Sequence, residues 1–375
     1  MARGTAKSRA TAKSTALPPR RARLAPAARE RLILDEAIRY FSDVGFGGQT
    51  RELSRRLGVT QPLLYRYFPS KQALVERVYQ EVFLGRCATV QLTPANGQRD
   101  KGIVDSSVIQ SVEALAAAIP HGAKLAIPGD DRGVAMAATL ALMRRGVRDL
   151  HLVCVPISGI QADILIGAGS VRTVETSAIT LGEYGLAPRF TAALKAGQLR
   201  ILDATCPAIH AALQATQKGQ PFVPIRGLLG TDVLRNRPDW KVIDNPFHAG
   251  EPIVLVPNIQ PDIALFHAPL ADRDGNVFIG RKRELLNMAH AAKQTFVTVE
   301  RIVDVSLLAD EGRAAGVIPS IYISRIACAE RGAWPLRFWD AYAEDEAELA
   351  RYAAMAKSAE GFRDWLDQWM SANVA

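Results

Sequence analysis

Glu183 is the residue whose neighbours best suit it to act as a nucleophile or base. It lies in the segment LGEYGLAP, where Gly182 and Gly185 expose the side chain and allow a ligand to approach the backbone. A carboxylate in such a place can accept an acyl group and divide one difficult transfer into two easier steps. The alternative interpretation of Glu183 is a surface glutamate in a turn. Glu175 is another acidic candidate, but it lies in a strand-like run and fits a solvated position on a strand face equally well.

A glycine-bounded loop is the second place where chemistry is possible. Gly129, Asp130, Asp131, Arg132 and Gly133 follow the apolar run KLAIP. The backbone N–H groups of such a loop, with a helix N-terminus, can hold an oxyanion or a phosphate. The two carboxylates weaken this interpretation, although Arg132 offsets part of their charge. The alternative is an ordinary strand-to-helix turn in which Asp131 caps the helix.

Two further loops carry polar residues. ALFHAPLADRDGN places His267 at the carboxyl end of a predicted strand, where open α/β sheets collect their ligands. The Asp, Gly and Asn residues that follow, up to Asn276, either face a substrate or form a β-turn, which these residue types favour through their own backbone conformations. Gly230 and Thr231 form another loop of the same kind. The candidate substrate-binding residues are therefore Gly129, Arg132, Gly133, Gly230, Thr231, His267 and Asn276.

The cysteines exclude several kinds of site. Cys87, Cys154, Cys206 and Cys328 lie far apart without a CxxC pair, so neither a zinc site nor a disulfide framework is expected. No other cluster has metal-ligand spacing. Cys206, beside Pro207, fits a buried packing residue better than a nucleophile. No apolar run approaches the roughly 18 residues of a membrane helix, and we expect a cytoplasmic protein.

These candidates require a scaffold of alternating strands and helices over residues 107–372. Strand-like and helical runs alternate, which predicts a mostly parallel α/β sheet. The strand-like runs are KLAI, RDLHLVCVP, VRTVETSAI and LRILDAT, and the helical runs between and after them are GVAMAATLALMRR, QADILIGAG, PRFTAALKAG and AIHAALQATQKG. Four more strand-like runs follow, EPIVLVPNI, DIALFHAPL, NVFI and QTFVTVERIV, and then a helical tail over about residues 338–372.

Positive charge is concentrated at the front of the chain. The 375 residues carry a net charge of +8, yet residues 1–85 alone hold sixteen Lys and Arg against seven Asp and Glu. The first 29 residues hold eight basic side chains and no acidic one, and few large apolar ones. We expect residues 1–28 to be a disordered basic arm. Such an arm could contact phosphates, act as an organelle transit peptide or solubilise the protein.

Four helices are predicted over residues 29–85, followed by a polar linker over residues 86–106. The first helix has an apolar stripe of Leu32, Ala37, Ile38, Phe41 and Val44. Gly58 supplies the tight turn between two later helices, as in helix-turn-helix units. Thr50, Thr60 and Ser70 are candidate N-caps. The inward positions of the later helices are Leu53, Leu57, Leu74, Val78, Val82 and Phe83.

The run TRELSRRLGVTQPLLYRYFPSKQALVERVY resembles the N-terminal DNA-binding domain of TetR-type repressors. The resemblance implies that the third helix lies in the major groove and that DNA is a partner. Groove-facing residues would be Thr60, Gln61, Leu63, Leu64 and Arg66, and phosphate-binding residues would be Thr50, Tyr65, Tyr67 and Lys71. Gln61 and Arg66 are the candidates for base readout. Alternatively the aromatic residues are core residues, which is our interpretation of Phe68.

Residues 107–372 resemble the alpha subunit of family I coenzyme A transferases of the glutaconate CoA-transferase type. The resembling motifs are IPHGAKLAIPG, LMRRGVRDLHLV, GLAPRFTAALKAG, GQPFVPIRGLLGTD and ALFHAPLADRDGNVFIG. The resemblance implies coenzyme A, as acyl-CoA, for a substrate, no metal, and a covalent glutamyl-CoA intermediate. It also implies that the main nucleophile lies on a separate beta subunit, so this chain would be inactive without that partner.

The two resemblances leave three hypotheses. The chain is a CoA-transferase subunit fused to a DNA-binding head, or a transcriptional regulator whose transferase-like domain senses an acyl-CoA or carboxylic acid. Alternatively two neighbouring reading frames were joined. TetR-type heads act as dimers, so we expect an oligomer held together by the second domain.

Overall fold

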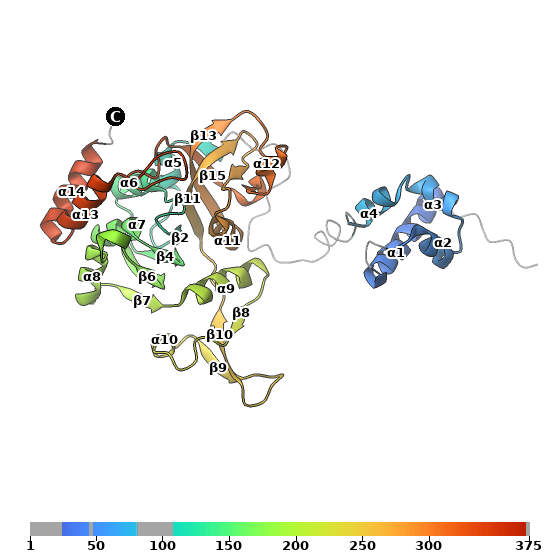
Figure 1. The fold of residues 1–375 in the computed structure, drawn as a ribbon, viewed down its shortest axis with the longest axis horizontal. Coiled ribbons are helices and arrows are strands. Elements are labelled where there is room, and N and C mark those ends of the chain that lie inside the picture. Colours follow the sequence, from blue (N-terminus) through green and yellow to red (C-terminus); the bar gives the residue numbers. More distant parts are fainter. Residues whose placement is uncertain (1–24, 45–47, 80, 82–107, 373–375) are drawn as a thin grey trace, which may run out of the picture. The chain divides into compact units, whose positions relative to one another are not determined.

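The computed structural model describes residues 25–44, 48–79, 81 and 108–372. The chain divides into two compact units, residues 1–97 and residues 98–375. We call their described parts the head and the body (Figure 1). The head is helical and the body is built on a mostly parallel sheet, which confirms the predicted fold class. The predicted linker and most of the basic arm lie outside the described residues.

The head consists of four helices, α1 (Pro26–Val44), α2 (Thr50–Leu57), α3 (Gln61–Tyr67) and α4 (Lys71–Tyr79). Its core contains residues from all four, namely Ile33, Leu34, Ala37, Tyr40, Phe41, Leu53, Leu64, Phe68, Leu74 and Val78. The predicted stripe of α1 is wrong at both ends, because Leu32 and Val44 are 47% and 49% exposed. The buried face instead runs through Ile33, Ala37 and Tyr40. Val82 and Phe83 lie outside the described residues.

The turn between α2 and α3 depends on Gly58, which has a left-handed φ of 63°. Its N–H donates to the carbonyl of Arg55, and the N–H of Val59 donates to that of Ser54. Thr60 is the N-cap residue of α3, but its hydroxyl makes no capping bond. The N-cap of α2 is Gln49 rather than Thr50. Ser70 was predicted correctly, since its Oγ accepts from the N–H of Ala73 at 3.0 Å.

The main sheet of the body has ten strands (Figure 1). Eight of them are parallel neighbours. In spatial order these are β1 (Ile109–Gln110), β15 (Arg325–Cys328), β13 (Gln294–Val303), β11 (Ile263–Asp272), β2 (Lys124–Pro128), β3 (Leu150–Val155), β5 (Val171–Thr176) and β7 (Arg200–Asp203). The remaining two, β12 (Val277–Phe278) and β14 (Val317–Ile318), are antiparallel additions.

Helices cover both faces of this sheet, so alternate residues of one strand enter different cores. Leu125 and Ile127 of β2 belong to one core and Ala126 belongs to the other. The first core packs against α5 (Val112–Ala117), α6 (Met136–Arg145), α7 (Ile160–Gly167), α8 (Pro188–Lys195), α13 (Glu346–Met355) and α14 (Ala359–Ala372). The second packs against α9 (Cys206–Gln217) and α11 (Arg283–Ala291).

A three-stranded antiparallel sheet extends below the main sheet in Figure 1. Its strands are β8 (Phe222–Ile225), β10 (Pro252–Pro257) and β9 (Lys241–Asp244). Two short strands, β4 (Ile157–Ser158) and β6 (Ala178–Ile179), form a parallel pair. The short helices are α10 (Val233–Asn236), α12 (Glu311–Ala314), η4 (Gly182–Tyr184) and η5 (Ser320–Tyr322).

The strand order reverses between β2 and β11. From β2 the chain proceeds to β3, β5 and β7 on one side, then returns to β11, β13 and β15 on the other. Open α/β sheets bind ligands at the carboxyl edge near such a switch point. The loops after β2, β3 and β5 are therefore the places to look for a site.

Candidate functional site

A cavity of about 320 Å³ lies at the carboxyl edge of the sheet. Its walls come from the segments after β2, β3 and β5, together with residues of the C-terminal region. The lining residues are Asp130, Asp131, Ile157, Ser158, Gly159, Ile160, Thr180, Leu181, Gly182, Glu183, Tyr184, Leu336, Arg337, Glu344, Leu349 and Tyr352. The tertiary structure thus brings Glu183 and the Gly129–Gly133 loop to one place.

Asp130 is held against the start of α7. The N–H of Ile160 donates to its Oδ2 at 3.1 Å, and a Cβ on Gly159 would lie 2.0 Å from the same oxygen. Only glycine at position 159 therefore leaves room for this carboxyl group. Its Oδ1 is buried and has no hydrogen-bond partner among the described residues. Desolvation raises the pKa of Asp130 to about 7. The hydrogen bond from the N–H of Ile160 acts in the opposite direction, but its effect is smaller.

Ser158 is a buried polar residue of the cavity wall. It is 2% exposed, and its Oγ has no hydrogen-bond partner in the described part of the chain. Tyr352 differs, because its hydroxyl donates to Asp163 Oδ2 at 2.6 Å. Asp163 also accepts from the N–H of Phe190 at 2.7 Å. Tyr352 and Asp163 are thus engaged with each other, whereas Asp130 and Ser158 each keep a polar atom without a protein partner.

Charge around the cavity is mostly negative. Asp131, Glu183 and Glu344 line it together with Asp130, whereas Arg337 is the single basic residue among the lining side chains. The sequence indicated Glu183 and the Asp pair but missed Ser158 and Arg337. Ser158-Gly159 directly after a strand was the available signal, because such a dipeptide exposes backbone and hydroxyl at a strand end.

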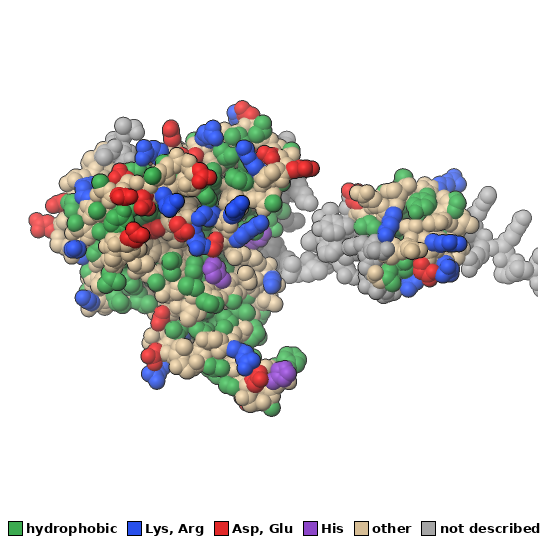
Figure 2. All heavy atoms as spheres, in the orientation of Figure 1, with side chains coloured by type: hydrophobic (Ala, Val, Ile, Leu, Met, Phe, Trp, Pro, Cys, Tyr) green, Lys and Arg blue, Asp and Glu red, His purple; other side chains and the backbone are tan. Residues whose placement is uncertain are grey.

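Arg132 and Lys282 lie on either side of Asp131. Arg132 pairs with Glu284 of α11 and donates to Asp131 Oδ1 at 3.1 Å. Lys282 Nζ donates to the carbonyl of Asp131 at 2.7 Å. Asp131 caps no helix, since the N-cap residue of α6 is Ala135, so that prediction was wrong. Figure 2 shows basic side chains gathered near the middle of the visible face of the body.

Gly133 has a structural reason to be glycine. Its φ is +84°, and a Cβ there would lie 2.2 Å from the carbonyl oxygen of His267. The N–H of His267 donates to the carbonyl of Gly133 at 2.7 Å. Gly129 is buried at the end of β2. These two glycines shape the loop that presents Asp130.

His267 does not face a substrate, which corrects the sequence-based prediction. It is 0% exposed because β11 is a central strand covered on both faces. Its Nδ1 lies 2.8 Å from Thr298 Oγ1, and its Nε2 lies 2.8 Å from Glu300 Oε1. Tyr342 donates to the same Glu300 oxygen at 2.9 Å. Burial lowers the pKa of His267. The contacts of its ring with Thr298 and Glu300 join β11 to β13.

The other predicted loops do not reach the cavity. Asn276 is 3% exposed and donates to both carboxylate oxygens of Asp272, so it stabilises a turn and was wrongly assigned to substrate. Gly230 and Thr231 are exposed between β8 and α10, where the Thr231 hydroxyl donates to the carbonyl of Leu228. Neither residue lines the cavity.

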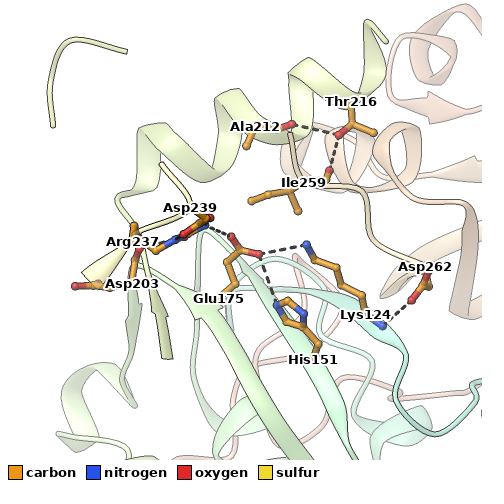
Figure 3. A network of polar contacts seen from close by, with 10 residues as sticks. All are labelled: Lys124, His151, Glu175, Asp203, Ala212, Thr216, Arg237, Asp239, Ile259 and Asp262. Atoms are coloured by element: carbon orange, nitrogen blue, oxygen red, sulfur yellow. Dashed lines mark hydrogen bonds and ion pairs between the residues drawn. The ribbon is translucent and has the colours of Figure 1, made fainter. Parts of the chain in front are cut away.

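Glu175 belongs to a buried polar network on the face of the sheet beneath α9 (Figure 3). It is 3% exposed, which excludes the solvated position considered above. Its carboxylate lies 3.0 Å from Arg237 Nη2, 3.3 Å from Lys124 Nζ and 3.6 Å from His151 Nε2. Burial by itself would raise its pKa, but the hydrogen bond with His151 and the charges of Lys124 and Arg237 outweigh burial and lower the pKa to about 2.

The head presents a mixed surface along α3. Thr60, Tyr65 and Arg66 are exposed, and Gln61, Leu63, Tyr67 and Lys71 are half-buried. Leu64 is 1% exposed in the core, so its predicted contact with DNA is wrong. Thr50 is 6% exposed, and its hydroxyl lies 2.9 Å from Tyr65 Oη and accepts from Gln61 Nε2 at 3.1 Å. The Thr50 hydroxyl therefore joins α2 to α3 and does not face a phosphate.

Comparison with protein-family models gives two matches. The model "Coenzyme A transferase" matches residues 109–329, more than half of the chain. The chain belongs to the coenzyme A transferase family. The model "Bacterial regulatory proteins, tetR family" matches residues 33–78, which confirms a TetR-type helix-turn-helix head in front of the transferase body.

Curated relatives of the transferase body include components of several enzymes. The A subunit of glutaconate CoA-transferase from Acidaminococcus fermentans is 30% identical over 285 residues, which covers 71% of this chain and 88% of that protein. The A subunit of 3-oxoadipate CoA-transferase from Pseudomonas knackmussii is 31% identical, covering 69% of this chain and 91% of that protein. The cholesterol ring-cleaving hydrolase IpdA subunit of Rhodococcus jostii is 26% identical, covering 74% of this chain and 94% of that protein.

Solved structures give the same result. Glutaconate coenzyme A-transferase from Acidaminococcus fermentans superimposes with a TM-score of 0.66 at 27% identity, covering 72% of this chain and 90% of that one. A variant of the decarboxylase AibA/AibB gives a TM-score of 0.62 at 29% identity, covering 70% of this chain and 98% of that one. This transferase body is therefore an alpha-subunit-like domain, confirming the resemblance seen in the sequence.

Two negative findings concern only the residues that the structure describes. No group of three or more His, Cys, Asp or Glu side chains there is arranged to hold a metal ion. None of the described helices combines the length and the hydropathy that crossing a bilayer requires.

Proposed function

We propose that the body is the alpha-type subunit of a CoA-transferase, which moves CoA between an acyl-CoA and a carboxylic acid together with a separate beta subunit. The observation that carries the proposal is the 30% identity across 88% of the A subunit of a glutaconate CoA-transferase. The cavity at the carboxyl edge supports it, because this edge is where an α/β sheet of this order binds ligands.

The proposed chemistry needs a carboxylate nucleophile. Its oxygen attacks the thioester carbonyl and CoA leaves as a thiolate, which gives a mixed anhydride. The thiolate then attacks the enzyme's own acyl carbon, forming a glutamyl-CoA thioester and releasing the first acid as its carboxylate. A second acid reverses these steps. We place this main nucleophile on the beta subunit, and Glu183, on an exposed turn of the cavity wall, near the reacting groups.

Coenzyme A would approach this cavity along a basic run. Arg281, Lys282 and Arg283 follow β12, and Lys282 contacts the loop that carries Asp131 and Arg132. Arg281 and Arg283 are exposed. Cations at this position can attract the phosphates of CoA while the thioester end enters the cavity.

Thioester exchange with the purified chain, its candidate beta partner and both together tests the enzyme proposal. We expect exchange only with both chains, and an intact-mass increase of CoA minus water on the partner. Absence of exchange across a panel of acyl-CoA donors would refute the proposal. A CoA adduct on this chain that disappears in Glu183→Gln would instead make Glu183 the nucleophile.

The head favours a second candidate function, in which the chain regulates transcription and the body senses an acyl-CoA or a carboxylic acid. The observation behind it is the TetR-type match at residues 33–78. The exposed Thr60 and Arg66 on α3 and the half-buried Lys71 at the start of α4 suit a major-groove and phosphate interface. Two heads on an inverted repeat would require a second copy of the chain.

A DNA-shift assay on the region upstream of the gene, with and without acyl-CoA, separates the two functions. Altered DNA affinity on adding acyl-CoA, without thioester exchange, would favour the regulator. Exchange with the beta partner and no effect of acyl-CoA on DNA affinity would favour the enzyme.

A further inference from the structure

We propose that two copies of the chain associate through β9, the edge strand of the three-stranded sheet, which pairs antiparallel with β9 of the second copy. The described lining residues of the cavity include none from β8, β9 or β10. This association is therefore independent of the proposed transferase function.

The three-stranded sheet has two edges, and they differ in how well they suit pairing with another strand (Figure 1). β8 forms one edge and contains Pro224, which has no N–H to donate to a neighbouring strand. β9 forms the other edge, with the sequence KVID and all four residues exposed. It contains no proline and has β-branched residues at its centre. Such an edge presents backbone N–H and C=O groups with which a strand of another chain can pair.

Large apolar side chains are exposed along this edge. Val242 and Ile243 are 53% and 40% exposed, and they point to opposite faces of the sheet because they are neighbours in a strand. Phe247, in the loop that joins β9 to β10, is 87% exposed. Exposed apolar side chains that gather in one place mark interaction surfaces, and aromatic residues contribute most of the binding energy there. A second strand beside β9 would cover Val242 on one face and Ile243 on the other.

The charges of β9 favour a second copy of the same strand as the partner. Lys241 begins the strand and Asp244 ends it. Side chains opposite each other lie on the same face of a sheet, so a twofold axis relating two β9 strands passes at Val242 or at Ile243. In either register, Lys241 lies within one position of Asp244 of the second copy. Parallel pairing would instead bring like charges together.

The surroundings of β9 carry no net charge. Residues 221–257 contain four Lys and Arg and four Asp and Glu. Two of these pairs are already formed within the sheet region, Arg226 with Glu251 and Arg235 with Asp232. The region therefore neither repels a copy of itself nor attracts a strongly charged partner.

The head gives an independent reason to expect two copies. Helix-turn-helix proteins bind two half-sites as dimers. Apolar residues from all four helices of the head pack into its own core. We therefore expect the contact that joins two copies to lie on the body, where the β9 edge is available.

Sedimentation velocity of the full chain over a range of concentrations measures the association, and we expect a reversible dimer. Val242→Glu should raise the dimer dissociation constant at least tenfold. The new carboxylate replaces an apolar contact and lies opposite itself or opposite Asp244 of the second copy, depending on the register. Ile321→Glu is the matched control, because Ile321 is 73% exposed in η5, outside the three-stranded sheet. That variant should leave the dissociation constant unchanged.

A charge swap tests the antiparallel arrangement. Lys241→Asp and Asp244→Lys should each weaken the dimer severalfold at low salt, because each brings like charges together at both ends of the paired strands. The double variant restores opposite charges and should restore the dissociation constant. Both positions are exposed, so the swap decides the proposal even if Val242→Glu fails to fold in urea unfolding.

The outcomes also separate this association from other partners. A chain that stays monomeric at every concentration, or a dimer that Val242→Glu does not weaken, would refute the proposal. Failure of the double variant to recover what both single variants lose would exclude antiparallel pairing with a second copy. If Val242→Glu abolishes thioester exchange with the beta partner and leaves self-association intact, the edge belongs to that partner instead. Lost self-association with retained exchange supports the proposal, and absence of exchange in the wild type refutes only the transferase function.

Discussion

Replacing Glu175 by Gln should destabilise the body by about 3 kcal/mol at pH 7. The pKa of Glu175 falls from 4.5 to about 2 in the folded protein. At about 1.36 kcal/mol per pKa unit, this shift corresponds to roughly 3 kcal/mol in favour of the folded state. The environment is buried, with Glu175 3% and Arg237 4% exposed, so solvent screens the interaction little. Removing one partner of a buried pair typically costs about 3–5 kcal/mol.

Urea unfolding followed by tryptophan fluorescence measures this change in the body alone. All five tryptophans, Trp240, Trp334, Trp339, Trp365 and Trp369, lie in the body. Trp240 also stacks beneath Arg237, with 4.4 Å between the guanidinium carbon and the ring centroid. Glu251→Gln is the matched control, because Glu251 is 43% exposed and pairs with Arg226 at the surface. That variant should change the free energy of unfolding by less than about 1 kcal/mol.

The pH dependence supplies a second criterion. Because the folded pKa lies below the unfolded one, the stabilisation is complete above pH 4.5 and is lost as the pH falls from 4.5 towards 2. The difference between wild type and Glu175→Gln should therefore begin to shrink as the pH falls below about 5, and most of it should be lost as the pH falls further towards 2. A cost no larger than that of Glu251→Gln, or a difference that stays constant from pH 7 to pH 3, would refute the reasoning.

Three further variants test the head and the cavity. Lys71→Ala should weaken binding to all DNA sequences and reduce the salt slope by about one, measured by titration at several salt concentrations; loss for a single sequence would contradict a phosphate contact. Gly159→Ala should cost about 1–3 kcal/mol in urea unfolding, because the added Cβ would lie 2.0 Å from Asp130 Oδ2, whereas Gly227→Ala meets no atom within 4 Å and should cost much less. Tyr352→Phe should cost about 1–3 kcal/mol by the same fluorescence assay, since it leaves Asp163 without its 2.6 Å donor; a change below about 0.5 kcal/mol would show that the bond contributes little.

Local sequence patterns were sufficient to predict most of the helices and strands of the body. Strand-like runs such as RDLHLVCVP became β3, and helical runs such as QADILIGAG became α7, because each carries its own periodicity and turn residues. The antiparallel sheet of β8, β9 and β10 was not foreseen. Its strands are short and partly exposed, and their pairing depends on contacts between distant segments.

Site residues were predicted less well, for a physical reason. His267 was predicted at the carboxyl end of a strand, but β11 continues to Asp272, so the side chain lies in the middle of the strand, where neighbours on both faces bury it. Leu64 belongs to a recognition helix, yet helical geometry turns it into the core of the head. Residue type and spacing predict which element a side chain belongs to, and they do not predict what covers it.

The sequence by itself determined the class of both parts of the chain. The first is a basic helix-turn-helix head, and the second is a longer body of alternating strands and helices with transferase motifs. Those features are local, because they depend on periodicity, capping residues and glycine positions within a few turns or strands. Only the tertiary structure decided that Asp130, Ser158 and Glu183 share one cavity while His267 and Glu175 are buried in separate networks. The strand order sets these neighbourhoods, since it brings loops from β2, β3 and β5 to one edge of the sheet.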